Sequence, residues 1–192
     1  QYPGMTRSLY EREPVFREHV DRGLRLYRER TGFDLRELLF GSPEDESVEA
    51  RLTEMVRQLP AIFIVEYAMV ELWASRGVEP AILIGHSMGE NVAACVAGVL
   101  SYEACLDWLI LRGRLFDRTE PGGMIAVSLP PEALEPHLAG RCDLAAINAP
   151  GLCVASGSEA EIDALEKRLD AAEIDFQRVA IGRAAHSRLL DP

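Results

Sequence analysis

Hydrophobic positions at helical spacing dominate the first half of the chain. Over residues 6–30 apolar side chains recur at every third or fourth position among many charges, with a break before Pro14, and this predicts surface helices with one buried stripe. Pro60 precedes an almost uniformly apolar segment, 61–76, which predicts a helix that starts there and is buried on most sides. A further helix is predicted over 102–117.

A short apolar segment before a glycine-containing turn has a different character. Residues 81–84, Ala-Ile-Leu-Ile, carry no charge and are typical of a central strand in a parallel sheet. The turn 85–89 follows directly, and residues 90–100 are alanine-rich and helical in character. The order of strand, tight turn and helix predicts an α/β core.

The period of the pattern changes at Gly123, after which short strands alternate with helices. The predicted elements are strands over 124–129, 144–148, 152–156 and 176–181, and helices over 131–139 and 159–172. This βαββαβ order is the pattern of a ferredoxin-like unit. We therefore expect an α/β fold with an α/β-hydrolase-like parallel-sheet core, truncated at both ends, over residues 1–122 and 183–192, and an inserted ferredoxin-like subdomain over residues 123–182.

The composition excludes several classes of protein. The 31 acidic and 20 basic side chains give a net charge of −11, which argues against a nucleic-acid partner. No apolar stretch approaches the length of a membrane span and no signal peptide is visible, so we expect a cytoplasmic protein with no membrane partner.

The four cysteines form no CxxC pair, which predicts buried, reduced thiols and no metal site. Because the chain starts at Gln1 within QYPGM, we expect an excerpt of something longer.

The candidate nucleophile is Ser87, in the turn Gly85-His86-Ser87-Met88-Gly89. In a GxSxG turn between a strand and a helix, the glycines permit a tight bend that holds the serine hydroxyl above the sheet edge. The following helix points its first amides at the same place, which makes the amide of Met88 the natural oxyanion-hole donor. The motif indicates a nucleophile because it lies between a predicted strand and a predicted helix. Without this context it would be weak evidence, since glycine and serine also occupy ordinary turns.

A serine hydroxyl needs a base to act as a nucleophile, and the chain offers four histidines. His19 and His137 are expected to be solvated surface residues. His86 is adjacent to the serine, so its side chain is expected to point away from it. His186 remains, on a loop whose small neighbours permit close approach, although a loop histidine is ordinary when taken alone.

Five motifs occur in order along the whole chain. They are QYPGM at 1–5, GHSMGE at 85–90, RGRLF at 112–116, NAP at 148–150 with SG at 156–157, and AHS at 185–187 with LDP at 190–192. Together they resemble the acyltransferase domain of polyketide synthases, and they are similar to the malonyl-CoA:acyl carrier protein transacylases of fatty acid synthesis. The five motifs in order are far more specific than any one of them.

The resemblance implies a ping-pong acyl transfer. Ser87 would attack the thioester of an acyl-CoA with His186 as general base, and the acyl group would pass to the phosphopantetheine thiol of an acyl carrier protein. The resemblance implies that main-chain carbonyl groups, rather than an aspartate, hold the histidine. No aspartate is evident as a third member in the sequence, although Asp107, Asp117, Asp143 and Asp163 stay open. Arg112 matches the family arginine that binds the free carboxylate of a malonyl-type extender. A planar guanidinium suits this role because it binds a carboxylate through two parallel hydrogen bonds. No bound cofactor is implied, and the other partners would be neighbouring synthase domains.

The resemblance also links extender choice to the residue after the serine and to the four residues that end at the histidine. Malonyl types tend toward HAFH there and methylmalonyl types toward YASH, whereas this chain has Arg183-Ala184-Ala185-His186. Met88, in place of glutamine, favours malonyl. Ala185 leaves space where a phenylalanine would close the pocket, so methylmalonyl or an unusual extender stays open.

Three other interpretations remain from the sequence. One is a stand-alone malonyl transacylase of fatty acid synthesis, and a second is a serine hydrolase such as an esterase or thioesterase, which would need an HGGG-like oxyanion loop that the sequence lacks. The third is a non-catalytic docking fragment of a megasynthase. The family's GQG turn, which supplies a glutamine of the oxyanion hole, is not in the sequence, so the excerpt alone is expected to be incomplete as a catalyst.

Overall fold

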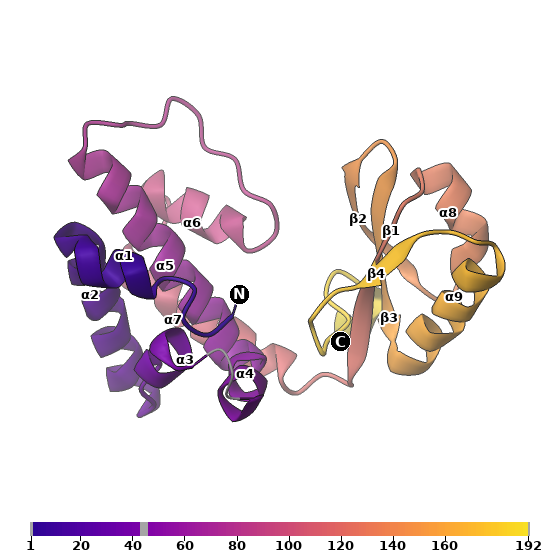
Figure 1. Cartoon of the computed structure of the whole chain (residues 1–192), viewed down its shortest axis with the longest axis horizontal. Helices are drawn as coiled ribbons and strands as arrows, with labels where there is room; N and C mark the ends of the chain where they lie inside the picture. The colour runs from indigo at the N-terminus through magenta and orange to yellow at the C-terminus, as the bar shows by residue number, and fades with distance from the viewer. Residues whose placement is uncertain (1, 43–45, 192) are drawn as a thin grey trace. The chain divides into compact units, whose positions relative to one another are not determined.

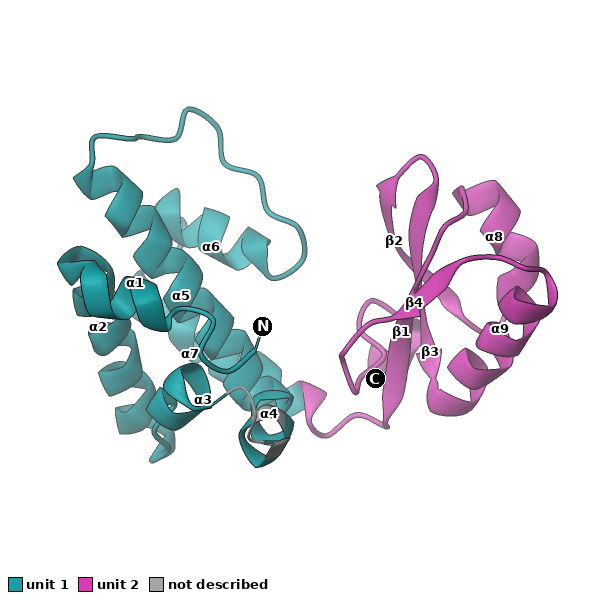
Figure 2. Ribbon diagram, viewed as in Figure 1, with its two compact units in different colours: residues 1–115 teal, residues 116–192 magenta. Residues whose placement is uncertain are grey.

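A computed structural model describes residues 2–42 and 46–191 and divides the chain into two compact units, 1–115 and 116–192 (Figure 2). Gln1 and Pro192, which belong to two of the motifs, lie outside the described residues. The described part of the first unit is helical, and the strands all lie in the second unit (Figure 1). Helices together with one small antiparallel sheet make this an α/β fold.

The first unit begins with two helices that the sequence predicts. The break predicted before Pro14 is confirmed, because one helix ends at Arg12 and the next starts at Pro14, where a proline is compatible with the first helical turn. The helices of this unit are α1 (Arg7–Arg12), α2 (Pro14–Thr31), α3 (Arg36–Phe40), α4 (Glu46–Leu52), α5 (Met55–Ser75), α6 (Gly89–Val96) and α7 (Tyr102–Phe116).

Helices α2 and α5 form the core of the first unit. Phe16 of α2 and Phe63 of α5 are both fully buried, and the Tyr27 hydroxyl donates a hydrogen bond of 3.0 Å to the carbonyl of Val56. The prediction that the long apolar helix starts at Pro60 is wrong, because α5 begins at Met55 and runs through the proline. A proline removes one helical hydrogen bond, and burial of the side chains around it offsets that cost.

The prediction of a central parallel strand over residues 81–84 is also wrong. These residues form no strand, and Ile82 and Ile84 are 86% and 93% exposed. A strand is defined by hydrogen bonds to neighbouring strands, and the described part of the first unit contains no strand to pair with them. The turn and the helix that follow this segment do form, as α6.

The second unit is a four-stranded sheet with two helices, in the βαββαβ order expected from the sequence. The sheet order is β2-β3-β1-β4 and every pair is antiparallel. Its elements are β1 (Gly122–Val127), α8 (Pro131–Leu138), β2 (Asp143–Ala149), β3 (Leu152–Ser158), α9 (Glu159–Ala171), β4 (Phe176–Arg178) and the short 3-10 helix η1 (Arg188–Leu190).

Both helices of the second unit pack on one face of this sheet (Figure 1). Ile125 of β1 lies opposite Ala155 of β3, and both join a buried cluster with Leu134 of α8 and Leu165 of α9. The alternation of strand residues places these side chains on the same face. The main chain returns to the start of the sheet at Arg183, which forms an isolated antiparallel bridge with Pro121.

Two expectations about thiols and membranes can be compared with the described residues. The four cysteines, Cys95, Cys105, Cys142 and Cys153, are free and buried, as predicted. Within residues 2–42 and 46–191, no helix has both the length and the apolar character that crossing a membrane requires.

Candidate active site

The turn that carries Ser87 is tight and has an unusual backbone. Ser87 has φ of +50°, a left-handed conformation that residues other than glycine rarely adopt. The amide of Gly89 donates to the His86 carbonyl at 3.0 Å, and the amide of Glu90 donates to the Ser87 carbonyl at 3.1 Å. These bonds close the first turn of α6 directly behind the serine. Strained backbone of this kind concentrates at functional sites.

The two glycines of the motif have different roles. A Cβ added to Gly85 would lie 2.2 Å from the amide nitrogen of Glu90, so only glycine fits where the chain enters the turn. A Cβ added to Gly89 would meet nothing within 4 Å in the described structure. The steric requirement predicted for both glycines therefore applies to Gly85.

A pocket of about 550 Å³ adjoins this turn and brings two of the motifs together. Its lining includes Met5 from the first motif and residues of the turn around Ser87. The full lining is Met5, Ile62, Val65, Glu66, Ile84, Gly85, His86, Met88 and Gly89.

Glu66 is the acidic side chain of this pocket, and the motif analysis does not find it. Burial raises the pKa of its carboxyl, and its Oε2 atom is buried with no hydrogen-bond partner among the described residues. A signal was present in the sequence, because Glu66 is a single acid within the apolar run Ile62–Val65 and Tyr67–Val70 of α5.

Arg112 lies on α7, at a place where this helix approaches α5 closely. The neighbouring Gly113 has no room for a side chain, since a Cβ there would lie 2.4 Å from Cα of Val56 and 2.6 Å from the carbonyl oxygen of Met55. The RGRLF motif thus contains both the candidate carboxylate ligand and the glycine that lets its helix pack. Ser101 caps the start of α7 by accepting a hydrogen bond of 3.1 Å from the amide of Ala104.

His186 lies in the second unit, on the loop between β4 and η1. Its φ is +57°, so it shares the left-handed backbone of Ser87. Ala184 and Ala185 before it are only 2% and 7% exposed. The guanidinium of Arg183 donates to the Asp117 carbonyl at 3.1 Å. The predicted extender stretch is therefore two buried alanines between a main-chain-bound arginine and an exposed histidine.

The predicted site residues fall into two groups. Ser87, Met88 and Arg112 belong to the first unit, whereas the stretch 183–186 belongs to the second. The structure describes the surroundings of each group separately. Within the described ranges, no cluster of three or more His, Cys, Asp and Glu side chains is placed to hold a metal ion.

The prediction that His19 is a solvated surface residue is wrong. Its ring centroid lies 6.0 Å from that of Tyr67, its side chain is 22% exposed, and its Nδ1 atom is buried without a hydrogen-bond partner in the described part of the chain. A second neighbour on α5 is Glu71, whose Oε2 atom lies 3.9 Å from Nε2 of His19. His19 is part of a packed aromatic cluster.

Comparison with known proteins identifies the family. The acyl transferase domain family model matches residues 1–192. The chain is 38% identical over 192 residues to one component of the phenolphthiocerol/phthiocerol polyketide synthase of Mycobacterium tuberculosis, covering all of this chain and 13% of that protein. It is 35% identical over 191 residues to erythronolide synthase EryA2 of Saccharopolyspora erythraea, covering 97% of this chain and 5% of that protein. The chain belongs to the acyl transferase domain family.

Solved structures agree with this assignment. The loading acyltransferase of the avermectin modular polyketide synthase matches with a TM-score of 0.90 and 30% identity, over 98% of this chain and 61% of that one. The acyl transferase domain of SpnD, in complex with 2-(pent-4-yn-1-yl)malonyl, matches with a TM-score of 0.88 and 35% identity, over 100% and 45%. MCAT from Streptococcus pneumoniae matches with a TM-score of 0.78 and 26% identity, over 99% and 62%. The fold is thus that of acyltransferase domains, and the chain spans less than two thirds of the relatives it matches.

Proposed function

We propose that this chain is part of a polyketide synthase acyltransferase domain that transfers a malonyl-type extender unit from acyl-CoA to an acyl carrier protein. The observation that carries the proposal is the strained backbone of Ser87 in a GxSxG turn, within a chain that matches the acyl transferase family from end to end. Neighbouring domains of a synthase are the expected surroundings, because the relatives are synthases of which this chain covers 13% or 5%.

The proposed reaction has two half-reactions. The Ser87 hydroxyl oxygen attacks the thioester carbonyl carbon of acyl-CoA while His186 takes its proton, and that proton leaves with the thiol of CoA when the carbon–sulfur bond breaks. The thiol of the carrier's phosphopantetheine then gives its proton to His186 and attacks the acyl-serine. Ser87 is restored when the proton returns to its oxygen. Acyl-CoA and phosphopantetheine enter as substrates, and no bound cofactor is required.

Two further groups serve this chemistry. The amide of Met88, at the start of α6, is proposed as the oxyanion-hole donor, because the first amides of a helix favour developing negative charge. Arg112 is proposed to bind the free carboxylate of the extender, since a guanidinium offers two parallel hydrogen bonds and stays charged when water is excluded. This pairing would favour malonyl-type donors over acetyl-CoA.

Extender choice is proposed to depend on Met88 and on the stretch Arg183-Ala184-Ala185. Malonyl is the first candidate. A substituted malonyl is the second, because Ala185 is smaller than the phenylalanine that malonyl types tend to have there and because the related SpnD domain was solved with 2-(pent-4-yn-1-yl)malonyl.

We also propose how the parent domain is organised. Residues 1–122 and 183–192 would belong to an α/β-hydrolase-like core and residues 123–182 to a ferredoxin-like subdomain. The strand order β2-β3-β1-β4 with both helices on one face supports the second assignment. The GxSxG turn followed directly by α6 supports the first. The proposed compartment is the cytoplasm.

A carrier-transfer assay tests the proposal against its competitors. The complete acyltransferase domain that contains this chain is given malonyl-CoA and a phosphopantetheine-bearing carrier, and both free CoA and acyl-carrier are measured. Transfer to the carrier that is lost in Ser87→Ala supports the proposal. Release of free malonate without acyl-carrier would indicate a hydrolase, and neither product would indicate a non-catalytic docking role.

A further inference from the structure

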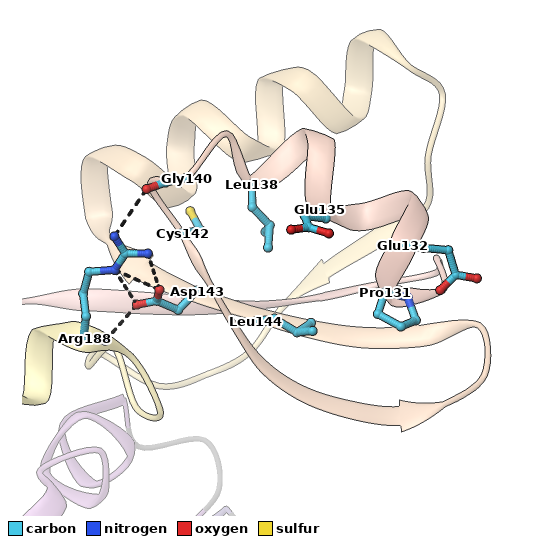
Figure 3. Close-up of a pocket in the computed structure, with 9 residues that line it drawn as sticks. All are labelled: Pro131, Glu132, Glu135, Leu138, Gly140, Cys142, Asp143, Leu144 and Arg188. Atoms are coloured by element: carbon cyan, nitrogen blue, oxygen red, sulfur yellow. Dashed lines mark hydrogen bonds and ion pairs between the residues drawn. The ribbon is translucent and has the colours of Figure 1, made fainter.

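The residue two positions after His186 is tied to the start of β2 by a single carboxylate. Arg188 donates to Asp143 from Nε at 2.9 Å, and its second terminal nitrogen also reaches Oδ1 (Figure 3). The main-chain amide of Arg188 donates to Oδ2 of the same carboxylate at 2.8 Å. Asp143 therefore holds both the side chain and the backbone of Arg188.

This arrangement differs from an ordinary surface ion pair. Exposed pairs stabilise folded proteins little, because two flexible side chains must be ordered in water. Here the carboxylate also accepts from a main-chain N–H, so it fixes the course of the chain as well as a side chain. The Asp143 side chain is 23% exposed, and Arg188 holds the pKa of its carboxyl below the ordinary value.

The backbone of His186, two residues before Arg188, has a conformation that neighbouring contacts must stabilise. The left-handed conformation of His186, with φ of +57°, is unfavourable for a residue other than glycine and persists only where neighbouring contacts enforce it. On the preceding side, Ala184 and Ala185 are buried. On the following side, the Ser187 hydroxyl donates to the Ala184 carbonyl at 2.7 Å and accepts from the amide of Leu189 at 3.2 Å.

We propose that Asp143 and Arg188 are positioning residues for His186. Their ion pair holds the main chain two residues after His186 against the start of β2, and this contact fixes the position of the imidazole. Neither residue belongs to any of the five motifs, and the two are 45 positions apart in the sequence. The inference rests on the proposed function, because it concerns the residue proposed as the general base.

The test compares Asp143→Ala and Arg188→Lys with a matched control, each made in the complete acyltransferase domain of which this chain is proposed to be part. Asp163→Ala removes a carboxylate from another arginine pair of the same unit, Arg178–Asp163, which lies on α9 and β4. The rate of acylation by malonyl-CoA, its KM, its pH profile and its final extent are measured, together with the NMR signals of the His186 ring.

The inference predicts that Asp143→Ala slows acylation at least about tenfold at unchanged KM and unchanged final extent, because a base displaced by about 1 Å costs up to about a hundredfold. The Arg188→Lys variant, which keeps the charge and the main-chain N–H, is expected to lose less. The pH profile and the His186 signals are expected to shift in Asp143→Ala and to stay unchanged in Asp163→Ala.

Three other results would count against parts of this account, and they are distinguishable. A lower final extent at an unchanged rate would show that fewer molecules fold, which overturns positioning. Unchanged His186 signals in Asp143→Ala would overturn it whatever the acylation rate. No acylation of the unaltered protein would instead overturn the proposed function, and with it the role assigned to His186.

Discussion

Ser87 and His186 share a backbone conformation that side-chain chemistry alone does not explain. Both have left-handed φ values, +50° and +57°, although neither is glycine. The sequence identifies these residues by motif, but their φ values depend on tertiary contacts such as those at Gly85 and Arg188. The same reason explains why the sequence cannot distinguish Asp143 from Asp107, Asp117 and Asp163, and why it misses Arg188, since their contact spans 45 positions and follows no periodicity.

The two glycines around Ser87 provide a matched pair of variants. Gly85→Ala is expected to abolish acylation and lower the melting temperature, because its Cβ would lie 2.2 Å from the Glu90 amide nitrogen. Gly89→Ala is expected to keep the melting temperature of the unaltered protein, since a Cβ at Gly89, the first residue of α6, would meet nothing within 4 Å in the described structure. Thermal unfolding and acylation rates measure both effects, and equal losses in the two variants would contradict this interpretation.

The buried carboxyl of Glu66 predicts a pH dependence of stability with a definite sign. Burial raises its pKa above the ordinary 4.5, so the folded state holds the proton more tightly than the unfolded state does. Its contribution is therefore fully present below about pH 4 and is lost as the pH rises through the folded-state pKa.

The Glu66→Gln variant removes this titration. It is expected to be more stable than the unaltered protein at pH 8, and the advantage is expected to shrink toward pH 4. Urea unfolding at several pH values measures the difference, with Glu11→Gln on α1 as the control for the loss of one negative charge. Two curves that stay parallel across this range would show that Glu66 is not the cause.

Among the elements, periodicity predicts the helices better than it predicts the strand before the nucleophile. The βαββαβ order of the second unit agrees with its alternating pattern, and α2 begins at the predicted proline. By contrast α5 continues through Pro60, and residues 81–84 form no strand although they are uniformly apolar. A strand depends on partners elsewhere in the sheet, so an apolar segment alone is insufficient evidence for one.

The contact between α7 and α5 gives a prediction at this scale. Gly113→Ala would place a Cβ 2.4 Å from Cα of Val56, so the two helices must separate. We expect a loss of about 1–3 kcal/mol in the free energy of unfolding, together with a higher KM for malonyl-CoA because Arg112 moves with α7. Denaturant unfolding and acylation kinetics measure these effects. Gly89→Ala is again the control, and a Gly113→Ala variant of normal stability would refute the close approach.

For the whole chain, the charge of −11 bears on the proposed transfer to a carrier. An acidic carrier would be repelled by this net charge, so local arginines would have to supply the contact. Lys167 is the only lysine, and arginine supplies every other basic side chain. This composition favours fixed, directional contacts to phosphate and carboxylate groups over diffuse positive charge.

The central claim is that Ser87 carries the acyl group, and intact-protein mass tests it most directly. The complete acyltransferase domain of which this chain is proposed to be part, and its Ser87→Ala variant, are exposed briefly to malonyl-CoA, methylmalonyl-CoA and acetyl-CoA. We predict one malonyl-sized adduct on the unaltered protein, none on Ser87→Ala, and none from acetyl-CoA. An adduct that survives in Ser87→Ala, or no adduct from any of the three donors, would contradict the acyl-serine mechanism.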